Sequence, residues 1–95
     1  MKVKIKMDDV KVIAADAQTL GEIGEFAYID TATWKVTDLE LVLNKEAIRE
    51  LGLKKPMFGP LTVCLPTTTI KLTGDVIALN VGINELRDLK ECKTE

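Results

Sequence analysis

Two carboxylates and one thiol stand where this chain could most easily carry out chemistry. Asp30 and Asp75 come at a strand end or in a turn, where a carboxylate usually accepts backbone N–H bonds. Cys64 alternates with Val63 and Leu65, which is typical of a small packed strand residue rather than a nucleophile. Histidine, the commonest general base, does not occur among the 95 residues. We therefore expect no catalytic residue and no enzymatic activity.

Metal and nucleotide sites are not expected either. Two cysteines, Cys64 and Cys92, cannot supply an ordinary structural zinc site without histidine, and we expect both thiols to be free in a reducing compartment. Residues 21–24 have the GxxG spacing of RNA-binding loops, but Glu22 and Glu25 would repel phosphate. The sequence predicts no metal and no cofactor.

Composition indicates one small domain over residues 1–95. Hydrophobic residues make up 46% of the chain, enough to form a single core. Charged residues recur from Lys2 onward, so neither a signal peptide nor direct membrane insertion is expected. The net charge of −2 argues against a direct nucleic-acid partner. We expect a cytoplasmic protein.

Strands are predicted along most of the chain, because apolar and polar residues alternate. The most informative stretch runs from Leu61 to Val81 and predicts strand, a break at Pro66, strand, a tight turn and strand. Gly74 in that turn is expected to have a positive φ. Earlier strands are expected over residues 2–7, 10–14, 20–31 and 34–43.

Two irregularities are expected in these strands. Residues 20–31 carry apolar groups on both faces, which predicts either a β-bulge at Gly24 or a second face buried against another chain. The apolar positions change parity within residues 34–43, which predicts a kink near Thr37 and Asp38. The strand core is expected to contain Val12, Ile23, Leu39, Leu41, Val63, Leu65, Ile70, Val76, Ile77 and Leu79.

Short helices are expected in two places. Asn44 can cap a helix over residues 45–51 that ends at Gly52. A second helix is expected at about residues 83–91. The fold class is therefore mainly β: a small, strongly bent antiparallel β-barrel over about residues 2–81, with one or two short helices.

The order of residues after position 64 resembles the PRC-barrel family. Members carry a hydrophobic-x-Pro pattern, a few polar residues, an aliphatic residue, and then Gly-Asp followed by alternating aliphatics. The matching positions here are Leu65-Pro66, Ile70, Gly74-Asp75, Val76, Ile77 and Leu79. Residues 16–43 are similar to the N-terminal signature of the family, so the resemblance covers about residues 8–81. The chain departs from the pattern in two places: residues 20–30 are one residue longer than usual, and Trp34 stands where a glycine is common in the turn.

The resemblance implies a protein-interaction module. Free-standing archaeal PRC barrels include cell-division adaptors linked to SepF and FtsZ, so the resemblance implies another PRC-barrel protein or SepF as a partner. It also implies recruitment to the division site. The alternative is a ribosome-maturation adaptor resembling the PRC barrel of RimM, although RimM-like binding usually needs a second domain.

A stripe of lysines marks the N-terminal strand. Lys2, Lys4 and Lys6 alternate with apolar residues, so they share one face of the strand. The stripe fits either a dock for an acidic partner or an edge strand protected by charge, and we favour the second interpretation.

The chain has more apolar side chains than one small interior can hold, which predicts a homodimer or larger assembly. Met57 and Phe58 stand between prolines, where they form either an exposed knob or a plug at one end of the barrel. The predicted protein interface comprises Phe26, Tyr28, Trp34, Met57, Phe58, Ile83, Leu86 and Leu89.

Overall fold

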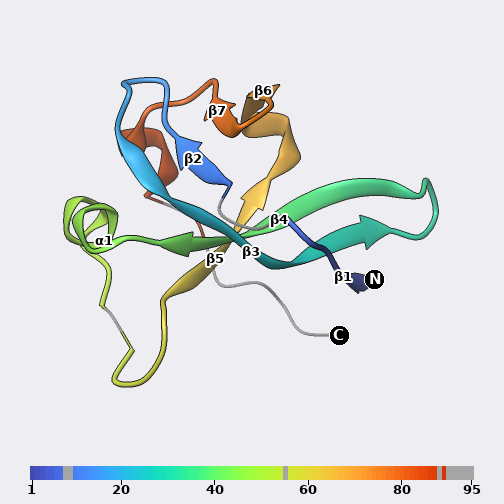
Figure 1. The fold of residues 1–95 in the computed structure, drawn as a ribbon, viewed down its shortest axis with the longest axis horizontal. Coiled ribbons are helices and arrows are strands. Elements are labelled where there is room, and N and C mark those ends of the chain that lie inside the picture. Colours follow the sequence, from blue (N-terminus) through green and yellow to red (C-terminus); the bar gives the residue numbers. More distant parts are fainter. Residues whose placement is uncertain (8–9, 55, 88, 90–95) are drawn as a thin grey trace.

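The computed structural model describes residues 1–7, 10–54, 56–87 and 89. It contains a seven-stranded sheet, one α-helix and two 3₁₀ helices (Figure 1). In chain order the elements are β1 (Lys2–Lys4), β2 (Lys11–Ile13), β3 (Thr19–Asp30), β4 (Lys35–Leu43), α1 (Lys45–Leu51), β5 (Thr62–Pro66), η1 (Thr67–Thr69), β6 (Ile70–Thr73), β7 (Val76–Leu79) and η2 (Ile83–Leu86). The mainly β class predicted from the sequence is confirmed.

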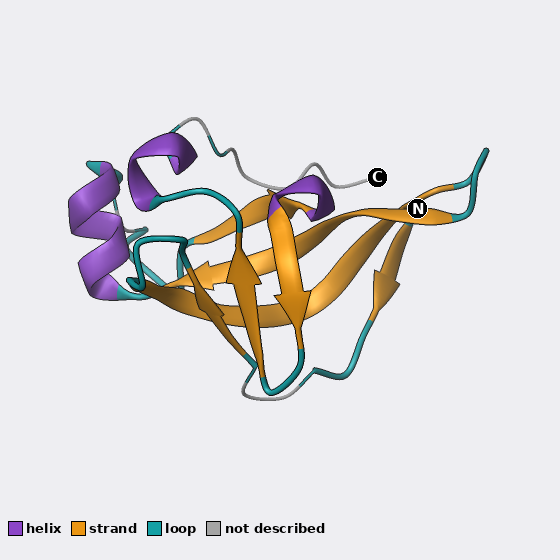
Figure 2. Ribbon diagram, turned by 90° about the horizontal axis from the view of Figure 1, so that it is seen from above, coloured by secondary structure: helices purple, strands orange, loops and turns teal. Residues whose placement is uncertain are grey.

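The sheet is one bent layer with the order β5-β4-β3-β2-β7-β6, and β1 pairs with β3 beyond the end of β2. η1 joins the two outermost strands, β5 and β6, so the sheet bends back toward its own other edge (Figure 2). No ladder joins β5 to β6 in the part of the chain that the structure describes, so a closed barrel is not formed there.

One strand pair departs from the antiparallel arrangement that the sequence predicted. β2 and β7 run parallel, with Val12 opposite Ile77 and Ile13 opposite Ala78. Parallel partners need a long connection, and here β3, β4, α1, β5 and β6 all lie between them in the chain. The prediction of a fully antiparallel sheet was therefore wrong at this pair.

The long β3–β4 hairpin contains both predicted irregularities. Ile23 pairs with Leu41 and Ala27 with Leu39, so residues 24–26 of β3 lie opposite a single residue, Glu40. This confirms the bulge at Gly24. The Glu40 side chain covers Gly24, and its Oε1 accepts a hydrogen bond of 3.0 Å from the Glu25 N–H.

The kink in β4 is also confirmed. The register shifts between the pairs Tyr28–Asp38 and Ile29–Val36, which leaves Thr37 without an opposite residue. The Thr37 hydroxyl donates to the main-chain oxygen of Tyr28 at 3.3 Å. This bond fixes the extra residue against β3.

The core lies on one face of the sheet and includes residues of α1 and η2, which contact each other at one end of the strands (Figure 2). The most completely buried side chains are Leu20, Leu41, Leu65, Ile77, Leu79, Val12 and Val63. Leu39 and Ile70 pack partly buried against this cluster. Val76 was wrongly predicted to be in the core: it lies opposite Lys11 on the outer face and is 40% exposed.

Helix α1 forms as the sequence predicts. The Asn44 side chain accepts a hydrogen bond of 2.7 Å from the Ala47 N–H, and Gly52 ends the helix with a φ of 67°. The Asn44 Nδ2 atom also donates to the main-chain oxygen of Thr19 at 2.9 Å. One side chain therefore caps the helix and fixes it to β3.

Two predictions in the C-terminal part need correction. The predicted helix at residues 83–91 begins as the 3₁₀ turn η2, while residues 88 and 90–95 lie outside the described residues. The predicted positive φ at Gly74 is wrong, since the positive-φ glycines are Gly21, Gly52 and Gly59.

Candidate interaction surfaces

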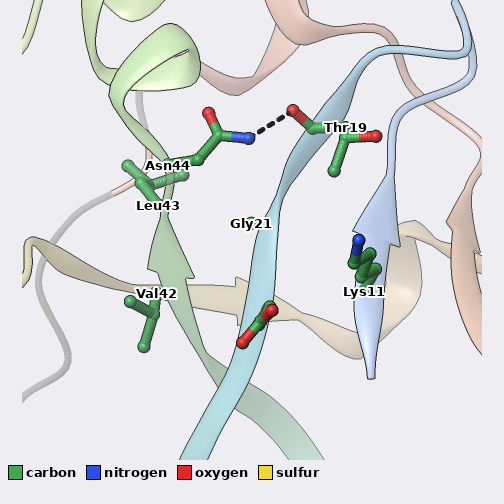
Figure 3. Close-up of a pocket in the computed structure, with 7 residues that line it drawn as sticks. Lys11, Thr19, Gly21, Val42, Leu43 and Asn44 are labelled. Atoms are coloured by element: carbon green, nitrogen blue, oxygen red, sulfur yellow. Dashed lines mark hydrogen bonds between the residues drawn. The ribbon is translucent and has the colours of Figure 1, made fainter. Parts of the chain in front are cut away.

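A hollow of about 310 Å³ lies on the outer side of the sheet where β2, β3 and β4 meet (Figure 3). Lys11 and Glu22 are direct cross-strand neighbours at its rim. Asn44 reaches it from the N-terminal end of α1, but its amide is occupied by the Thr19 and Ala47 bonds (Figure 3). The polar groups here are explained by packing and capping.

Asp30 and Asp75, the two carboxylates considered for chemistry, lie at a turn in the structure, as the sequence predicts. Asp30 accepts hydrogen bonds through its side chain from the Ala32 N–H at 2.9 Å and through its main-chain oxygen from the Trp34 N–H at 2.6 Å. Asp75 is exposed in the β6–β7 turn. Among the described residues, no three His, Cys, Asp or Glu side chains group as a metal site.

Cys64 departs from the prediction of free thiols. It faces away from the core beside Glu40, and it is disulfide-bonded. Cys92, the other cysteine of the sequence, lies outside the described residues. The sequence carried no signal for a disulfide at Cys64, because cysteine spacing in a sequence does not report distances in the fold.

The helices of the described residues are all short. None of them is both long and apolar enough to cross a lipid bilayer.

Part of the predicted protein interface lies inside the chain. Ile83 and Leu86 are buried in the core, and Leu89 packs partly buried against it. The helical spacing of these residues was read correctly as one apolar face. That face covers the chain's own sheet, so placing Ile83 and Leu86 on a partner-facing surface was wrong.

Met57 and Phe58 form an exposed knob on the loop between α1 and β5, which extends away from the sheet (Figure 1). Their side chains are 89% and 86% exposed. Pro56 precedes them, and Gly59 follows with a φ of 77°. The alternative in which this loop plugs one end of the barrel is wrong.

Trp34 and Val36 form the hairpin tip at the far end of β3 and β4 from the helices (Figure 2). Trp34 is 69% exposed and has a φ of 59°, a conformation that costs an L-residue about 1–2 kcal/mol. The chain has a tryptophan there that packs little against its own body.

Phe26 and Tyr28 lie on the outer face of β3 and are partly buried. β1 covers them from the side, with Lys4 opposite Phe26 and Lys2 opposite Tyr28. The Lys2 ammonium lies 4.2 Å from the centre of the Phe26 ring. These two aromatic residues are therefore less available to a second chain than the knob or the hairpin tip.

The sequence did not reveal a fourth surface, which we call the β2–β7–β6 face. Ile13, Ala78 and Leu72 are successive cross-strand neighbours, and Val76 shares their side of β7. Leu72 is 63% exposed, and a hollow of about 570 Å³ lies over this row. Because Val76 and Ile77 are both aliphatic, alternation alone could not show which of them faces outward.

Comparison with known proteins does not assign the chain to a family. No protein-family model and no curated protein matches it. The PRC-barrel resemblance thus stays a prediction, and the surfaces must be interpreted from their own chemistry.

Apart from Met1, the large apolar side chains that are exposed among the described residues occupy three separate places: the knob, the hairpin tip and the β2–β7–β6 face. The knob and the tip are small protrusions, whereas the face crosses three strands. Small protrusions suit insertion into a pocket of another molecule, while a broad sheet face suits packing against a similar surface.

Proposed function

We propose that this chain is a non-enzymatic protein–protein interaction module that works as a homodimer and holds other proteins together. The observation that carries the proposal is the exposure of large apolar side chains beside a core that is already filled. They are Met1, Trp34, Val36, Met57, Phe58, Leu72 and Val76. Apolar surface of this kind marks interaction sites.

The β2–β7–β6 face is the proposed dimer surface. A stable interface needs roughly 800 Å² from each partner, which a two-residue knob cannot supply, so we place the dimer contact on the broader sheet face. β6 is also an outermost strand, so a second copy can pack on the face beside an open edge. Contact between identical faces gives a closed two-fold dimer.

The knob is the proposed docking point for other proteins. Aromatic and methionine side chains that fill a partner's pocket often supply most of the binding free energy. Pro56 and Pro60 restrict the loop before binding, which reduces the entropy lost on docking.

The PRC-barrel resemblance extends the proposal to the kind of partner. It favours an adaptor in cell division that binds another PRC-barrel protein or a division protein such as SepF. The residues that carry this extension are those of the resemblance, from Leu65-Pro66 to Leu79.

Sedimentation equilibrium at micromolar concentration tests the dimer. The wild type is expected at twice the chain mass of 10.5 kDa, and Leu72→Glu is expected to be a monomer because dimerisation would bury its carboxylate. Phe58→Glu is the matched control and should stay dimeric. A wild-type monomer would refute the homodimer, and a dimeric Leu72→Glu variant would refute the chosen face.

Binding to purified SepF, measured by surface plasmon resonance, tests the partner. Phe58→Glu should weaken binding at least about tenfold, the effect of losing a hot-spot residue. Trp34→Glu, at the other end of the molecule, should bind like the wild type. If the wild type does not bind, the proposal that SepF is the partner is refuted. If Phe58→Glu binds as tightly as the wild type, the proposal that the knob is the docking point is refuted.

A further inference from the structure

The hydrogen bonds of β1 show which of its main-chain groups point away from the sheet. Met1 and Ile29 exchange two hydrogen bonds of 2.6 and 2.8 Å, and the Ile5 N–H donates to the Glu25 oxygen at 2.7 Å. In an antiparallel ladder, hydrogen-bonded pairs alternate with non-hydrogen-bonded pairs. Lys2 and Lys4, which lie between these residues, therefore direct their N–H and C=O groups away from β3.

This outer edge of β1 is open. β2 and β1 pair with the same side of β3, at residues 19–22 and 26–28 respectively. Within the part of the chain that the structure describes, no strand pairs with the other side of β1. In Figure 2 β1 lies at one margin of the sheet, near the N-terminus.

The open edge is basic. Lys4 and Lys6 are exposed, and together with Ile5 and Glu25 they line a hollow of about 480 Å³. The Lys2 ammonium is held nearby over the Phe26 ring. Of the described residues that line the hollow, Lys4 and Lys6 are basic and Glu25 is acidic, so the basic groups outnumber the acidic one among them although the whole chain has a net charge of −2.

We propose that this edge binds an extended acidic peptide, which adds to the sheet as a further strand. The residues that carry the lysine side chains are the same ones that offer free main-chain groups. A strand paired with Lys2 and Lys4 places its residues opposite them on the same face, where carboxylates would meet the ammonium groups. Its intervening residues share the face of Val3, which is partly buried, so apolar side chains fit there.

The ligand is therefore an alternating peptide, with Asp or Glu at every second position and aliphatic residues between. Charge protection of an edge strand also explains the lysines, but it predicts no preference for how the acidic residues of a ligand are spaced. The alternating pattern is what separates peptide addition from simple attraction of anions. The β1 edge is also distinct from the dimer face and the knob. Peptide binding can therefore be confirmed or refuted independently of the proposed homodimer.

Fluorescence anisotropy with a labelled peptide of alternating Glu and Val, four Glu and three Val, tests the site. A peptide of the same composition with its glutamates grouped should bind at least about tenfold more weakly, because only the alternating order matches both faces. Equal binding of the two peptides would overturn strand addition. A single-stranded DNA oligonucleotide that binds as tightly as the alternating peptide would instead indicate a general anion site and overturn the proposal.

The protein variants are chosen to leave the Lys2–Phe26 contact in place. Lys4→Glu/Lys6→Glu should weaken binding of the alternating peptide at least about tenfold, whereas Lys35→Glu/Lys45→Glu, with the same change in charge, should bind like the wild type. Amide hydrogen exchange gives a second measurement: the Lys4 N–H should become protected when the peptide binds. Unchanged affinity in the Lys4/Lys6 variant, or no protection at Lys4, would refute the site.

Discussion

A Cβ atom added to Gly21 would overlap the main-chain carbonyl oxygen of Val42 on the neighbouring strand. Gly21 also has a φ of 154°, a conformation that L side chains rarely adopt. It lines the hollow shown in Figure 3, where it pairs with Leu43 of β4. The close approach of these two strands therefore depends on the absence of a side chain.

Gly21→Ala should reduce the free energy of unfolding by about 3 kcal/mol or more, because the added methyl group forces both a backbone shift and strain. Urea denaturation measures the change. Gly74→Ala is the matched control: nothing lies within 4 Å of its Cβ position, so a change within about 0.5 kcal/mol is expected. Equal effects at the two glycines would contradict the close approach.

Trp34→Gly should raise the free energy of unfolding by about 1 kcal/mol, because glycine adopts the positive φ without strain. Ala17→Gly, at the other non-glycine residue with positive φ, should give a similar gain. Trp34→Ala keeps the backbone strain and should not raise the free energy of unfolding. A loss of stability in Trp34→Gly as large as in Trp34→Ala would show that the indole ring packs usefully within the chain.

Asn44→Ala should reduce the free energy of unfolding by about 2 kcal/mol, since it removes both the helix cap and the bond to Thr19. Asn44→Asp keeps the acceptor for Ala47 and loses only the donor to Thr19, so about half that loss is expected. Thermal and urea unfolding of the three proteins give the comparison. Equal losses in the two variants would mean that the Thr19 bond, and not the cap, carries the effect.

Cys64→Ser removes the disulfide and should reduce the free energy of unfolding by about 2–4 kcal/mol under oxidising conditions. Wild type unfolded in the presence of a reductant should match the variant. If the variant is as stable as the oxidised wild type, the disulfide does not contribute to folding.

Local features of the fold could be predicted from the sequence because they depend on neighbouring residues. The cap at Asn44 and the helix end at Gly52 follow from side-chain hydrogen bonding and from φ. The bulge at Gly24 and the kink near Thr37 follow from changes in the alternation of apolar residues. Each of these signals lies within a few residues of the feature it predicts.

Features that depend on distant partners could not be predicted in this way. The parallel pairing of β2 with β7 decides that Ile77 faces the core and Val76 faces outward, yet both are aliphatic. In the same way, the spacing of Ile83 and Leu86 predicts an apolar face but not what covers it. The position of α1 beside η2 shows that this face is buried within the chain. For the candidate site, the knob and Trp34 were found from residue type, and the β2–β7–β6 face was missed.

The pairing of β2 with β7 also bears on how the chain folds as it leaves the ribosome. β2 is made before β3, but its other neighbour, β7, is made only after β6. Until then the β2 edge and the apolar side chains of Val12 and Leu20 lack the covering of Ile77 and Leu79. Because its non-local contacts close last, the domain should reach its native state only after translation has passed β7.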